Sequence, residues 1–345
     1  MKSMDAQYMQ RALELAQLGR GSVSPNPMVG CVIVHEGTII GEGWHRLYGE
    51  AHAEVNAVNS VADKALLKES TCYVTLEPCS HYGKTPPCAD LLARHALKRV
   101  VVAVKDSNPL VGGQGMARLE AAGIEVDYGV LEAEARKLNA RFFTSIEKNR
   151  PYIVLKWAQT ADGFVARTNF DSKWISNADS RLQVHQWRGE EDAIMVGTNT
   201  ARYDNPRLNV RGVKGNNPLR VVIDKRLALD PGLNLFDGSQ STICYNLLED
   251  KQNGSTTWLK VRDEQLLEDI LADLHGRKVQ SVFVEGGSYL LNSLIAQGHW
   301  DEARVFESQT SFGEGIAAPK IDFAASHSSE VGTDTLKIYH NPEPK

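Results

Sequence analysis

The chain of 345 residues is longer than one ordinary hydrophobic core requires, so we expect two domains. Hydrophobic residues make up 42% and charged residues 23%, which excludes a disordered chain. The net charge of −5 argues against a nucleic-acid-binding protein, which needs a broad basic surface, but it is compatible with a local basic pocket for one phosphate.

The amino-terminal segment predicts an amphipathic helix rather than an export signal. Its apolar residues recur at helical spacing, and Asp5 and Glu14 interrupt what would have to be the apolar core of a signal peptide. No apolar run approaches the roughly 20 residues that span a bilayer. The five cysteines fit a reducing compartment and metal or catalytic use better than a disulfide framework. We therefore expect a cytoplasmic protein, and a homo-oligomer is compatible with the sequence.

Strand and helix patterns alternate through the first half of the chain. The expected elements are a hairpin at 30–34 and 38–40, a helix at about 51–61, a strand at 71–77, a helix at 87–97, a buried strand at 100–106, a helix at 116–122 and a polar helix at about 131–149. This alternation predicts a layered α/β sheet. Because the residue before Pro151 is disfavoured in a helix, we place a boundary there and expect domains at 1–150 and 151–345.

The second half has a similar alternation. Strands are expected at 152–157, 193–196, 219–224, 242–245 and 281–285, and helices at 178–187, 264–274 and 289–296. The segments 246–257 and 310–327 read as surface loops. The second half is therefore also expected to be an α/β domain.

His52, Glu54, Cys79 and Cys88 form the sharpest pattern in the sequence. One imidazole and two thiolates make a zinc site with three protein ligands, which leaves the fourth tetrahedral position for water. Bound zinc lowers the pKa of that water towards about 7, and Glu54 can carry its proton to a departing amine. Cys79 follows a strand, where α/β sheets bind ligands, and Pro87 favours a helix start at Cys88. The pattern predicts a catalytic zinc site.

Two other interpretations of these residues stay open at this point. A structural zinc site would need a fourth protein ligand, for which His45 and His81 are the candidates. Alternatively, the cysteines are buried residues without a metal, as we expect for the isolated cysteines at 31, 72 and 244. The carboxylate of Glu54, two residues after His52, favours the catalytic site.

The first half resembles the deaminase of riboflavin biosynthesis. Nucleobase deaminases carry H-x-E followed by P-C-x-x-C. The chain has the first part, but its two cysteines stand further apart, in PCSHYGKTPPC, with HAE upstream and SPNPMVG at 24–30. The resemblance implies a cytidine-deaminase-like three-layer α/β domain. That domain removes the pyrimidine amine from a diaminopyrimidine ribosyl phosphate.

The same resemblance implies roles for individual residues. It assigns His52, Cys79 and Cys88 to zinc and Glu54 to proton transfer, and it places substrate contacts at Asn26, His45, Lys84, Asp106 and Asn108. An asparagine amide can pair with a ring edge, and a lysine can meet a phosphate. Taken alone, Asn26 would be a turn residue before Pro27 and Lys84 a solvated loop residue. Ser107 stands where the family usually has proline.

The second half contains one local motif with chemical meaning. Glu285-Gly286-Gly287-Ser288 joins a predicted strand to a predicted helix, so its backbone N–H groups can cradle a phosphate, or it is an ordinary strand-to-helix turn. No G-x-G-x-x-G follows the first strand, so the standard dinucleotide fingerprint is absent from the sequence.

This half resembles the reductase domain of the same bifunctional family. The resemblance is carried by Lys156 with Ala158, Asp162-Gly163, SKWIS at 172–176 and AIMVGTNTARYDNPRLNVR at 193–211. It implies a dihydrofolate-reductase-like α/β fold that uses NADPH to convert the ribosyl group to a ribityl chain. From Phe306 onward the match weakens, so the terminal strands are the least supported part.

The resemblance also implies a residue set for each ligand. NADPH contacts are expected at Ala158, Trp174, Thr200, Asp204, Gly287, Ser288, Tyr289, Leu290, Leu291, Asn292 and Ser293. Substrate contacts are expected at Ser172, Arg188, Leu208, Arg211 and Glu285, with Lys156 near the reacting sugar. Opening of the sugar needs a proton donor, for which Lys156 and Glu285 are candidates. Arg188 and Arg211 can bind the phosphate with their planar forks, although a solvated helix face and a loop salt bridge are the plainer interpretations.

Three hypotheses of function follow. The leading one is a bifunctional enzyme that deaminates and then reduces one phosphorylated pyrimidine intermediate, with Zn²⁺ and NADPH as cofactors. The second is a zinc deaminase of free nucleosides or tRNA with a second domain that only binds a ligand. The third is a structural zinc module joined to a ligand-binding domain. The acidic charge argues against tRNA, and retention of every activity in Glu54→Gln would favour the third.

Overall fold

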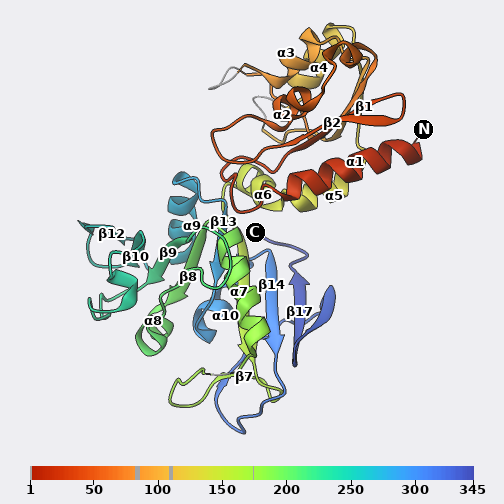
Figure 1. Ribbon diagram of the computed structural model, residues 1–345. Coiled ribbons are helices and arrows are strands. Elements are labelled where there is room, and N and C mark those ends of the chain that lie inside the picture. Colours follow the sequence, from red (N-terminus) through yellow and green to blue (C-terminus); the bar gives the residue numbers. More distant parts are fainter. Residues whose placement is uncertain (1, 82–85, 109–111, 174) are drawn as a thin grey trace. The chain divides into compact units, whose positions relative to one another are not determined.

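The computed structural model describes residues 2–81, 86–108, 112–173 and 175–345. The chain forms two compact units, Met1–Lys148 and Asn149–Lys345, which are described separately below (Figure 1). None of the described helices is long and apolar enough to cross a membrane.

The first unit is built on a five-stranded sheet with the order β2-β1-β3-β4-β5. The strands are β1 (Gly30–His35), β2 (Thr38–Trp44), β3 (Thr71–Leu76), β4 (Arg99–Val104) and β5 (Glu125–Tyr128). β1 runs antiparallel to β2 and β3, whereas β3, β4 and β5 are parallel. The predicted layered α/β sheet is thus confirmed.

Helices cover both faces of this sheet. Alternate side chains of β1 point to opposite faces: Val32 and Val34 pack with α1 (Lys2–Gln17) and α5 (Glu132–Leu138), and Cys31 and Ile33 pack on the other face. The helices of that second face are α2 (Ala53–Ser60), α3 (Cys88–Arg94) and α4 (Gln114–Ala121). Figure 1 shows α1 across the sheet from α2, α3 and α4. The first unit is therefore a three-layer sandwich of helices around a sheet, with η1 (Lys64–Glu69) as a short connection.

The predicted polar helix at about 131–149 is wrong as a single element. It is divided into α5 and α6 (Ala140–Lys148) at Asn139. The Asn139 side chain is buried, accepts a hydrogen bond from the Met28 backbone N–H and donates one to the Met28 carbonyl, each over 2.8 Å. The helix breaks where this side chain ties it to the segment before β1. β5 was not predicted, because its four residues include two acidic side chains and are only partly buried.

The second unit is built on a ten-stranded sheet with the order β11-β12-β10-β9-β8-β13-β6-β14-β17-β16. Its strands are β6 (Tyr152–Gln159), β8 (Ala193–Gly197), β9 (Leu219–Ile223), β10 (Thr242–Asn246), β11 (Lys251–Asn253), β12 (Thr256–Lys260), β13 (Ser281–Val284), β14 (Glu302–Glu307), β16 (His327–Val331) and β17 (Asp334–His340). The strands from β12 to β14 in this order are parallel, and an antiparallel strand or pair extends each end.

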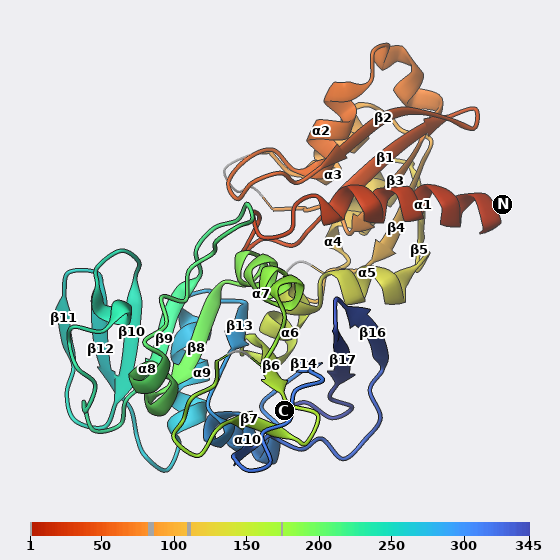
Figure 2. The same ribbon diagram turned by 60° about the horizontal axis from the view of Figure 1, so that its bottom comes forward.

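Helices also cover both faces of the second sheet (Figure 2). Leucine and isoleucine side chains of α9 (Leu266–Gly276) and α10 (Ser288–Gln297) join one hydrophobic core with the strands. On the opposite face, Trp187 of α7 (Ala178–Glu190) lies with its ring centroid 5.5 Å from that of Phe306. The remaining elements are α8 (Thr198–Asp204), η2 (Asn234–Phe236) and the small sheet of β7 (Phe164–Ala166) with β15 (Ile316–Ala317).

Two segments predicted as loops contain strands. The segment 246–257 includes β11 and the start of β12, and 310–327 includes β15. β11 is a fully exposed edge strand of polar residues, so it lacks the alternation of apolar side chains on which strand prediction depends. The weakly matched end of the chain forms β16 and β17, which extend the sheet beyond β14.

Candidate active sites

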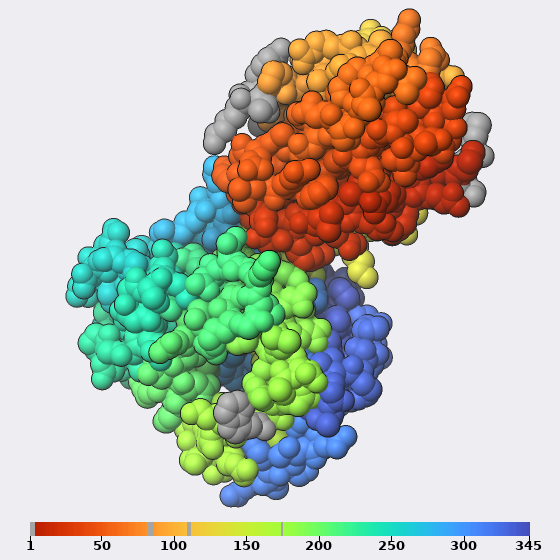
Figure 3. Space-filling model, viewed as in Figure 1, coloured from red at the N-terminus to blue at the C-terminus, as the bar shows by residue number. Residues whose placement is uncertain are grey.

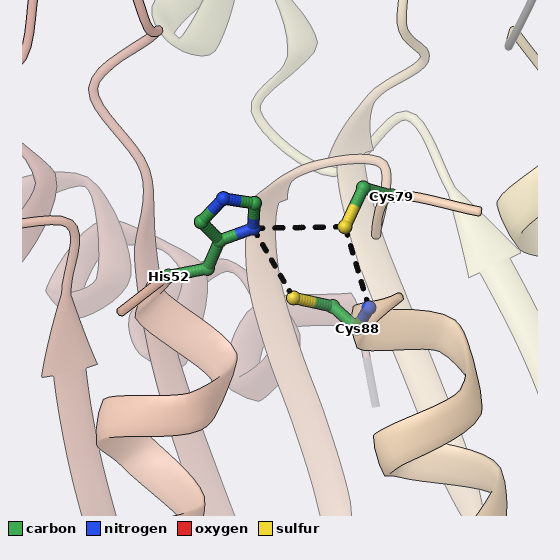
Figure 4. A group of neighbouring side chains, drawn as sticks. All are labelled: His52, Cys79 and Cys88. Atoms are coloured by element: carbon green, nitrogen blue, oxygen red, sulfur yellow. Dashed lines mark hydrogen bonds between the residues drawn. The ribbon is translucent and has the colours of Figure 1, made fainter. Parts of the chain in front are cut away.

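His52, Cys79 and Cys88 converge from three parts of the first unit. His52 lies directly before α2 rather than in its first turn as predicted, Cys79 follows β3, and Cys88 is the first residue of α3. His52 Nδ1 lies 3.6 Å from Cys79 Sγ and 3.4 Å from Cys88 Sγ (Figure 4). All three candidate ligand atoms lie within 4.8 Å of one another.

These spacings fit a tetrahedral zinc ion. With Zn–S near 2.3 Å and Zn–N near 2.0 Å, two ligands at a tetrahedral angle stand about 3.6 Å apart. The distances of 3.4 and 3.6 Å from His52 Nδ1 to the two sulfur atoms match this ligand-to-ligand spacing. The residue types and their spacing therefore suit zinc.

The cysteines are arranged to carry negative charge. The Cys88 backbone N–H donates to Cys79 Sγ over 3.3 Å. Hydrogen bonding from Cys88, with a further contribution from His52, lowers the pKa of Cys79 to about 4. The hydrogen bond with the Cys79 side chain, followed by burial, raises the pKa of Cys88, so that Cys79 rather than Cys88 carries the negative charge. A divalent cation favours both thiolates, because a coordinating thiol is deprotonated.

Glu54 lies in the first turn of α2 and is buried, with 3% of its surface exposed. Burial is the main cause that raises the pKa of its carboxyl to about 7, and the charge of Cys79 raises it further. A hydrogen bond with the Cys88 side chain partly lowers this pKa again. The same hydrogen bond places the Glu54 carboxyl beside the candidate metal ligands. A carboxyl with a pKa near neutrality can both accept and release a proton.

Neither candidate for a fourth protein ligand joins the cluster. His45 is 2% exposed, and both of its ring nitrogens are engaged: Nδ1 with the Ala51 carbonyl at 3.2 Å and Nε2 with Asn26 Nδ2 at 3.1 Å. His81 is exposed on the loop after Cys79. Among the described residues, no further His, Cys, Asp or Glu belongs to this ligand group. The arrangement favours the catalytic over the structural interpretation.

Asn26 and His45 form one hydrogen-bonded pair beside His52. The Ala51 carbonyl can only accept, so His45 Nδ1 carries the proton and its Nε2 accepts from the Asn26 amide. Burial lowers the pKa of His45, which agrees with this neutral tautomer. The His45 and His52 rings meet edge to face with centroids 5.6 Å apart. The structure thus brings these two predicted substrate contacts to the candidate metal site.

Asp106 and Asn108 lie on the loop after β4. The Asp106 carboxylate accepts a hydrogen bond from the Asn108 backbone N–H over 2.8 Å, and burial raises the pKa of Asp106. The predicted contact Lys84 lies outside the described residues.

Glu77 organises this loop and was not singled out from the sequence. Its buried carboxylate accepts hydrogen bonds from four backbone N–H groups over 2.8–3.3 Å, namely those of Asp106, Gly113, Gly115 and Met116. The loop with Asp106 and the start of α4 are thereby tied to the residue that precedes Pro78 and Cys79. The only sign of this role in the sequence is an acidic residue at the end of a buried strand. The four backbone groups that bind Glu77 lie far along the chain, so the sequence does not reveal them.

The second unit contains a cavity of about 710 Å³ at the carboxyl ends of β6, β8 and β13. Figure 3 shows the surface of this unit hollowed between green and yellow-green atoms, with blue atoms at the bottom. Most of the predicted reductase residues line it: Lys156, Ala158, Ser172, Arg188, Thr200, Asp204, Arg211, Glu285, Gly287, Ser288, Tyr289, Leu290 and Leu291. The predicted substrate and cofactor residues therefore share one cavity.

Three predicted residues are not part of the cavity wall. Leu208 is buried with a positive φ of 50°. Asn292 and Ser293 lie further along α10, where their side chains bond to Ser288 and Tyr289. Trp174 lies outside the described residues.

The polar groups of the cavity centre on Arg188 and Glu285. Arg188 donates two hydrogen bonds to the Glu285 carboxylate, over 2.5 and 2.7 Å, and a third to the Asn209 carbonyl. Its planar fork is therefore directed at Glu285, which excludes the solvated helix face, and the contact of Arg188 with a phosphate stays a prediction. Lys156 lies on the cavity wall nearby, and burial lowers the pKa of its ammonium while the charge of Glu285 opposes this.

The turn at Gly286 and Gly287 brings α8 and α10 together. A Cβ at Gly286 would lie 2.9 Å from Thr200 Oγ1, and Gly287, with a φ of 72°, directly precedes α10. Glycine is needed here for the close approach and for the left-handed backbone. This geometry is compatible with both the phosphate cradle and the ordinary turn.

The fold and the two sites together define a class of enzyme with two units. The first unit has the site of a zinc-dependent deaminase, and the second is an α/β unit with a ligand cavity. Family comparisons agree. Residues 2–104 match the cytidine and deoxycytidylate deaminase zinc-binding region, and residues 151–332 match the RibD C-terminal domain.

Similar proteins cover nearly the whole chain. The riboflavin biosynthesis protein RibD of Aquifex aeolicus is 42% identical over 92% of this chain and 90% of its own, and that of Escherichia coli is 37% identical over 88% and 87%. The crystal structure of a diaminohydroxyphosphoribosylaminopyrimidine deaminase/5-amino-6-(5-phosphoribosylamino)uracil reductase from Thermotoga maritima is 36% identical, covers 99% of each chain and has a TM-score of 0.91. Acinetobacter baumannii RibD, at 32% identity, covers 99% and 100% with the same score.

The chain belongs to the RibD family of riboflavin biosynthesis. It is a bifunctional enzyme with a zinc-dependent deaminase and an NADPH-dependent reductase. The predicted family, fold class, activities and cofactors are confirmed.

Proposed function

We propose that the domain 1–150 hydrolyses the pyrimidine amine of 2,5-diamino-6-ribosylamino-4(3H)-pyrimidinone 5′-phosphate and that the domain 151–345 reduces the ribosyl group of the product to ribityl. The observation that carries the first step is the convergence of His52, Cys79 and Cys88 beside the buried carboxyl of Glu54. A cytoplasmic location belongs to this proposal, supported by five free cysteines. The acidic net charge supports a small phosphorylated substrate rather than a nucleic acid.

In the deaminase, His52, Cys79 and Cys88 would hold Zn²⁺, which lowers the pKa of a coordinated water and polarises it for attack. Glu54 takes a proton from the attacking water and delivers it to the departing nitrogen, so that ammonia leaves and oxygen takes its place. Burial of Glu54 supports this role, because its pKa of about 7 suits both transfers. Asn26, held by His45, orients the ring edge, and Asp106 and Asn108 complete the substrate site together with Lys84.

In the reductase, bound NADPH would supply a hydride, and the carbon of the opened sugar that accepts it must be an imine or a carbonyl. Lys156 provides the proton that ring opening and reduction require, because burial lowers the pKa of its ammonium and eases proton release. Glu285 binds a sugar hydroxyl while Arg188 holds its carboxylate in place. The part of the cavity that would bind NADPH is lined by Thr200, Asp204 and the start of α10.

A mass-resolved assay with the purified protein and the diaminopyrimidine ribotide tests the proposal. Without NADPH we expect one product, in which oxygen replaces an amine. With NADPH we expect that product to gain two hydrogens while NADPH is oxidised. Deamination of cytidine or tRNA but not of the ribotide would overturn the substrate assignment, and deamination without NADPH oxidation would make the second unit a binding domain.

A further inference from the structure

Asn209 connects three nitrogen-bearing side chains at the cavity of the second unit. Its backbone carbonyl accepts hydrogen bonds from His185 Nδ1 and from Arg188 Nη1, each over 3.2 Å. Its side-chain Oδ1 accepts from Arg211 Nη1 over 2.6 Å. His185, Arg188 and Arg211 all line the cavity. One loop residue therefore sets the positions of all three side chains.

Three of the five N–H groups of Arg188 are engaged within the protein. Its Nε and Nη2 donate to Glu285, and its Nη1 donates to Asn209. The side chains of Arg188 and Glu285 are about nine-tenths buried, so this pair is electrically neutral as a unit. Breaking it would leave a buried carboxylate without its partner, which is costly. Because Glu285 neutralises Arg188, we expect further cationic contacts of a bound anion to come from other side chains.

His185 lines the cavity, and only one of its two ring nitrogens has a hydrogen-bonding partner among the described residues. A carbonyl oxygen only accepts, so Nδ1 carries the proton in its bond to Asn209, and the neutral ring has a lone pair at Nε2. Among the residues that the structure describes, Nε2 has no hydrogen-bonding partner. On protonation, Nε2 becomes a charged donor without disturbing the bond of Nδ1.

The charges around His185 disfavour that proton until an anion binds. The charged groups that act on His185 are Arg188, Arg211 and Glu285. Further charged residues line the cavity, namely Lys156, Lys173, Arg181 and Asp204, and Arg207 acts on Arg211. Burial, followed by the charges of Arg188 and Arg211, lowers the pKa of His185 to about 4. A phosphate dianion bound between Arg211 and His185 would make the electrostatic potential at His185 negative and so favour its protonation.

We propose that His185 is a third anion-binding side chain of this cavity, which takes up a proton when the substrate's phosphate binds and donates to it from Nε2 beside Arg211. The proposal rests on the proposed reductase function. It identifies the phosphate of the substrate, rather than a phosphate of NADPH, as the partner of His185.

Binding of ribose 5-phosphate, measured by calorimetry between pH 6 and pH 9, tests this role. His185→Asn keeps an N–H donor near the Asn209 carbonyl but has no group at the position of Nε2, whereas His185→Gln places a neutral N–H there. His327→Asn, an exposed histidine on β16, is the matched control. We expect His185→Asn to weaken binding about tenfold near pH 6, the size of one charge-assisted hydrogen bond, and the difference from wild type to shrink as the pH rises.

His185→Gln should bind with intermediate affinity and without this added pH dependence. In wild-type protein at pH 7.5, the binding enthalpy should change with the ionisation enthalpy of the buffer, because a proton is taken up, and His185→Asn should lose this dependence. Equal binding by wild type and His185→Asn at every pH would overturn the proposal. So would loss of NADP⁺ binding with ribose 5-phosphate binding intact, since the histidine would then serve the cofactor.

NADPH oxidation with the deaminated substrate separates this proposal from the proposed function. If wild-type protein oxidises NADPH but His185→Asn binds ribose 5-phosphate normally, only the role of His185 falls. If wild-type protein turns over yet binds no ribose 5-phosphate, the anion site is wrong and the reductase stands. If it neither binds nor turns over, the reductase function itself is wrong.

Discussion

At the scale of single residues, Glu54 and the three candidate zinc ligands have different roles in one site. The ligands are a histidine and two cysteines, which bind a metal as neutral imidazole and as thiolates. The carboxyl lies beside them in the first turn of α2, where burial brings its pKa to about 7. Metal binding and proton transfer are thus assigned to different side chains, and substitution can separate them.

Glu54→Gln should abolish deamination and leave zinc in place. The amide keeps the shape of the side chain but cannot carry a proton, so we expect a loss of about 100-fold or more in the rate. Elemental analysis should still find one zinc per chain. Glu50→Gln, an exposed residue on the loop before α2, should change neither quantity. Substantial deamination by Glu54→Gln would contradict the role of this carboxyl in proton transfer.

Prediction from the sequence was strongest for residues in short motifs. His52, Cys79 and Cys88 could be paired because ligand chemistry restricts residue type and spacing. Glu77 and His185 could not be found in the same way, since each acts through backbone groups far along the chain. The partner of Arg188 was also beyond sequence reasoning: an arginine near a sugar phosphate site suggests an anion from the substrate, whereas the structure supplies Glu285.

At the scale of elements, α1 is attached to the sheet by a buried ion pair. Asp5 of α1 accepts two hydrogen bonds from the guanidinium of Arg99, the first residue of β4, over 2.9 and 3.1 Å, and one from the Tyr73 hydroxyl over 2.7 Å. The hydrogen bond from Arg99 is the largest cause that lowers the pKa of Asp5, although burial acts against it. The carboxylate therefore stabilises the fold while it stays ionised.

Asp5→Asn should lower the free energy of unfolding by about 1–3 kcal/mol at neutral pH. Because the pKa of Asp5 is lower in the folded state, its contribution is present above the unfolded pKa and is lost as the pH falls through the folded pKa. The difference between wild type and variant should thus shrink below about pH 4. Urea unfolding from pH 7 to pH 3 measures this. Glu14→Gln, an exposed residue of α1, should show only a small effect; a difference for Asp5→Asn that is independent of pH would contradict the assignment.

The packing of α4 against the loop after β3 gives a second prediction at this scale. A Cβ at Gly115 would lie 1.9 Å from the Pro78 carbonyl oxygen, next to Cys79. Gly115→Ala must push α4 away from this loop, at a cost of about 1–3 kcal/mol. We expect a lower melting temperature and weaker zinc binding. Gly276→Ala, at a position where a Cβ meets nothing within 4 Å, should leave zinc affinity unchanged; unchanged zinc affinity in both variants would show that the loop does not depend on this contact.

Elements with a regular apolar pattern were predictable, and those formed by long-range contacts were not. β1, β3 and β4 have continuous buried runs that can be read directly. The break at Asn139 depends on a hydrogen bond to Met28, 111 residues away. β11 and β16 are edge strands with exposed polar residues, and they exist because a neighbouring strand pairs with them.

At the scale of the whole molecule, each unit carries the described residues of one candidate site. The metal ligands and Glu54 lie within the first unit, and the cavity with Lys156 lies within the second. We therefore expect the chemistry of each site to need no side chain of the other.

The two activities should be separable by single substitutions. Glu54→Gln should still oxidise NADPH when it is given the deaminated substrate. Lys156→Met should deaminate normally and lose reduction by about 100-fold or more, because it removes the proposed proton donor. Rates for each variant with both substrates test this prediction. Loss of both activities in either variant, with both units folded, would show that the sites depend on each other.

The most direct test of the account is a crystal structure of the zinc-loaded protein with diffraction data collected on both sides of the zinc absorption edge. We predict one anomalous peak bonded to His52 Nδ1, Cys79 Sγ and Cys88 Sγ, with solvent as the fourth ligand and the Glu54 carboxyl within hydrogen-bonding distance of that solvent. A fourth protein side chain on the zinc, or a Glu54 carboxyl turned away from it, would contradict the proposed hydrolysis.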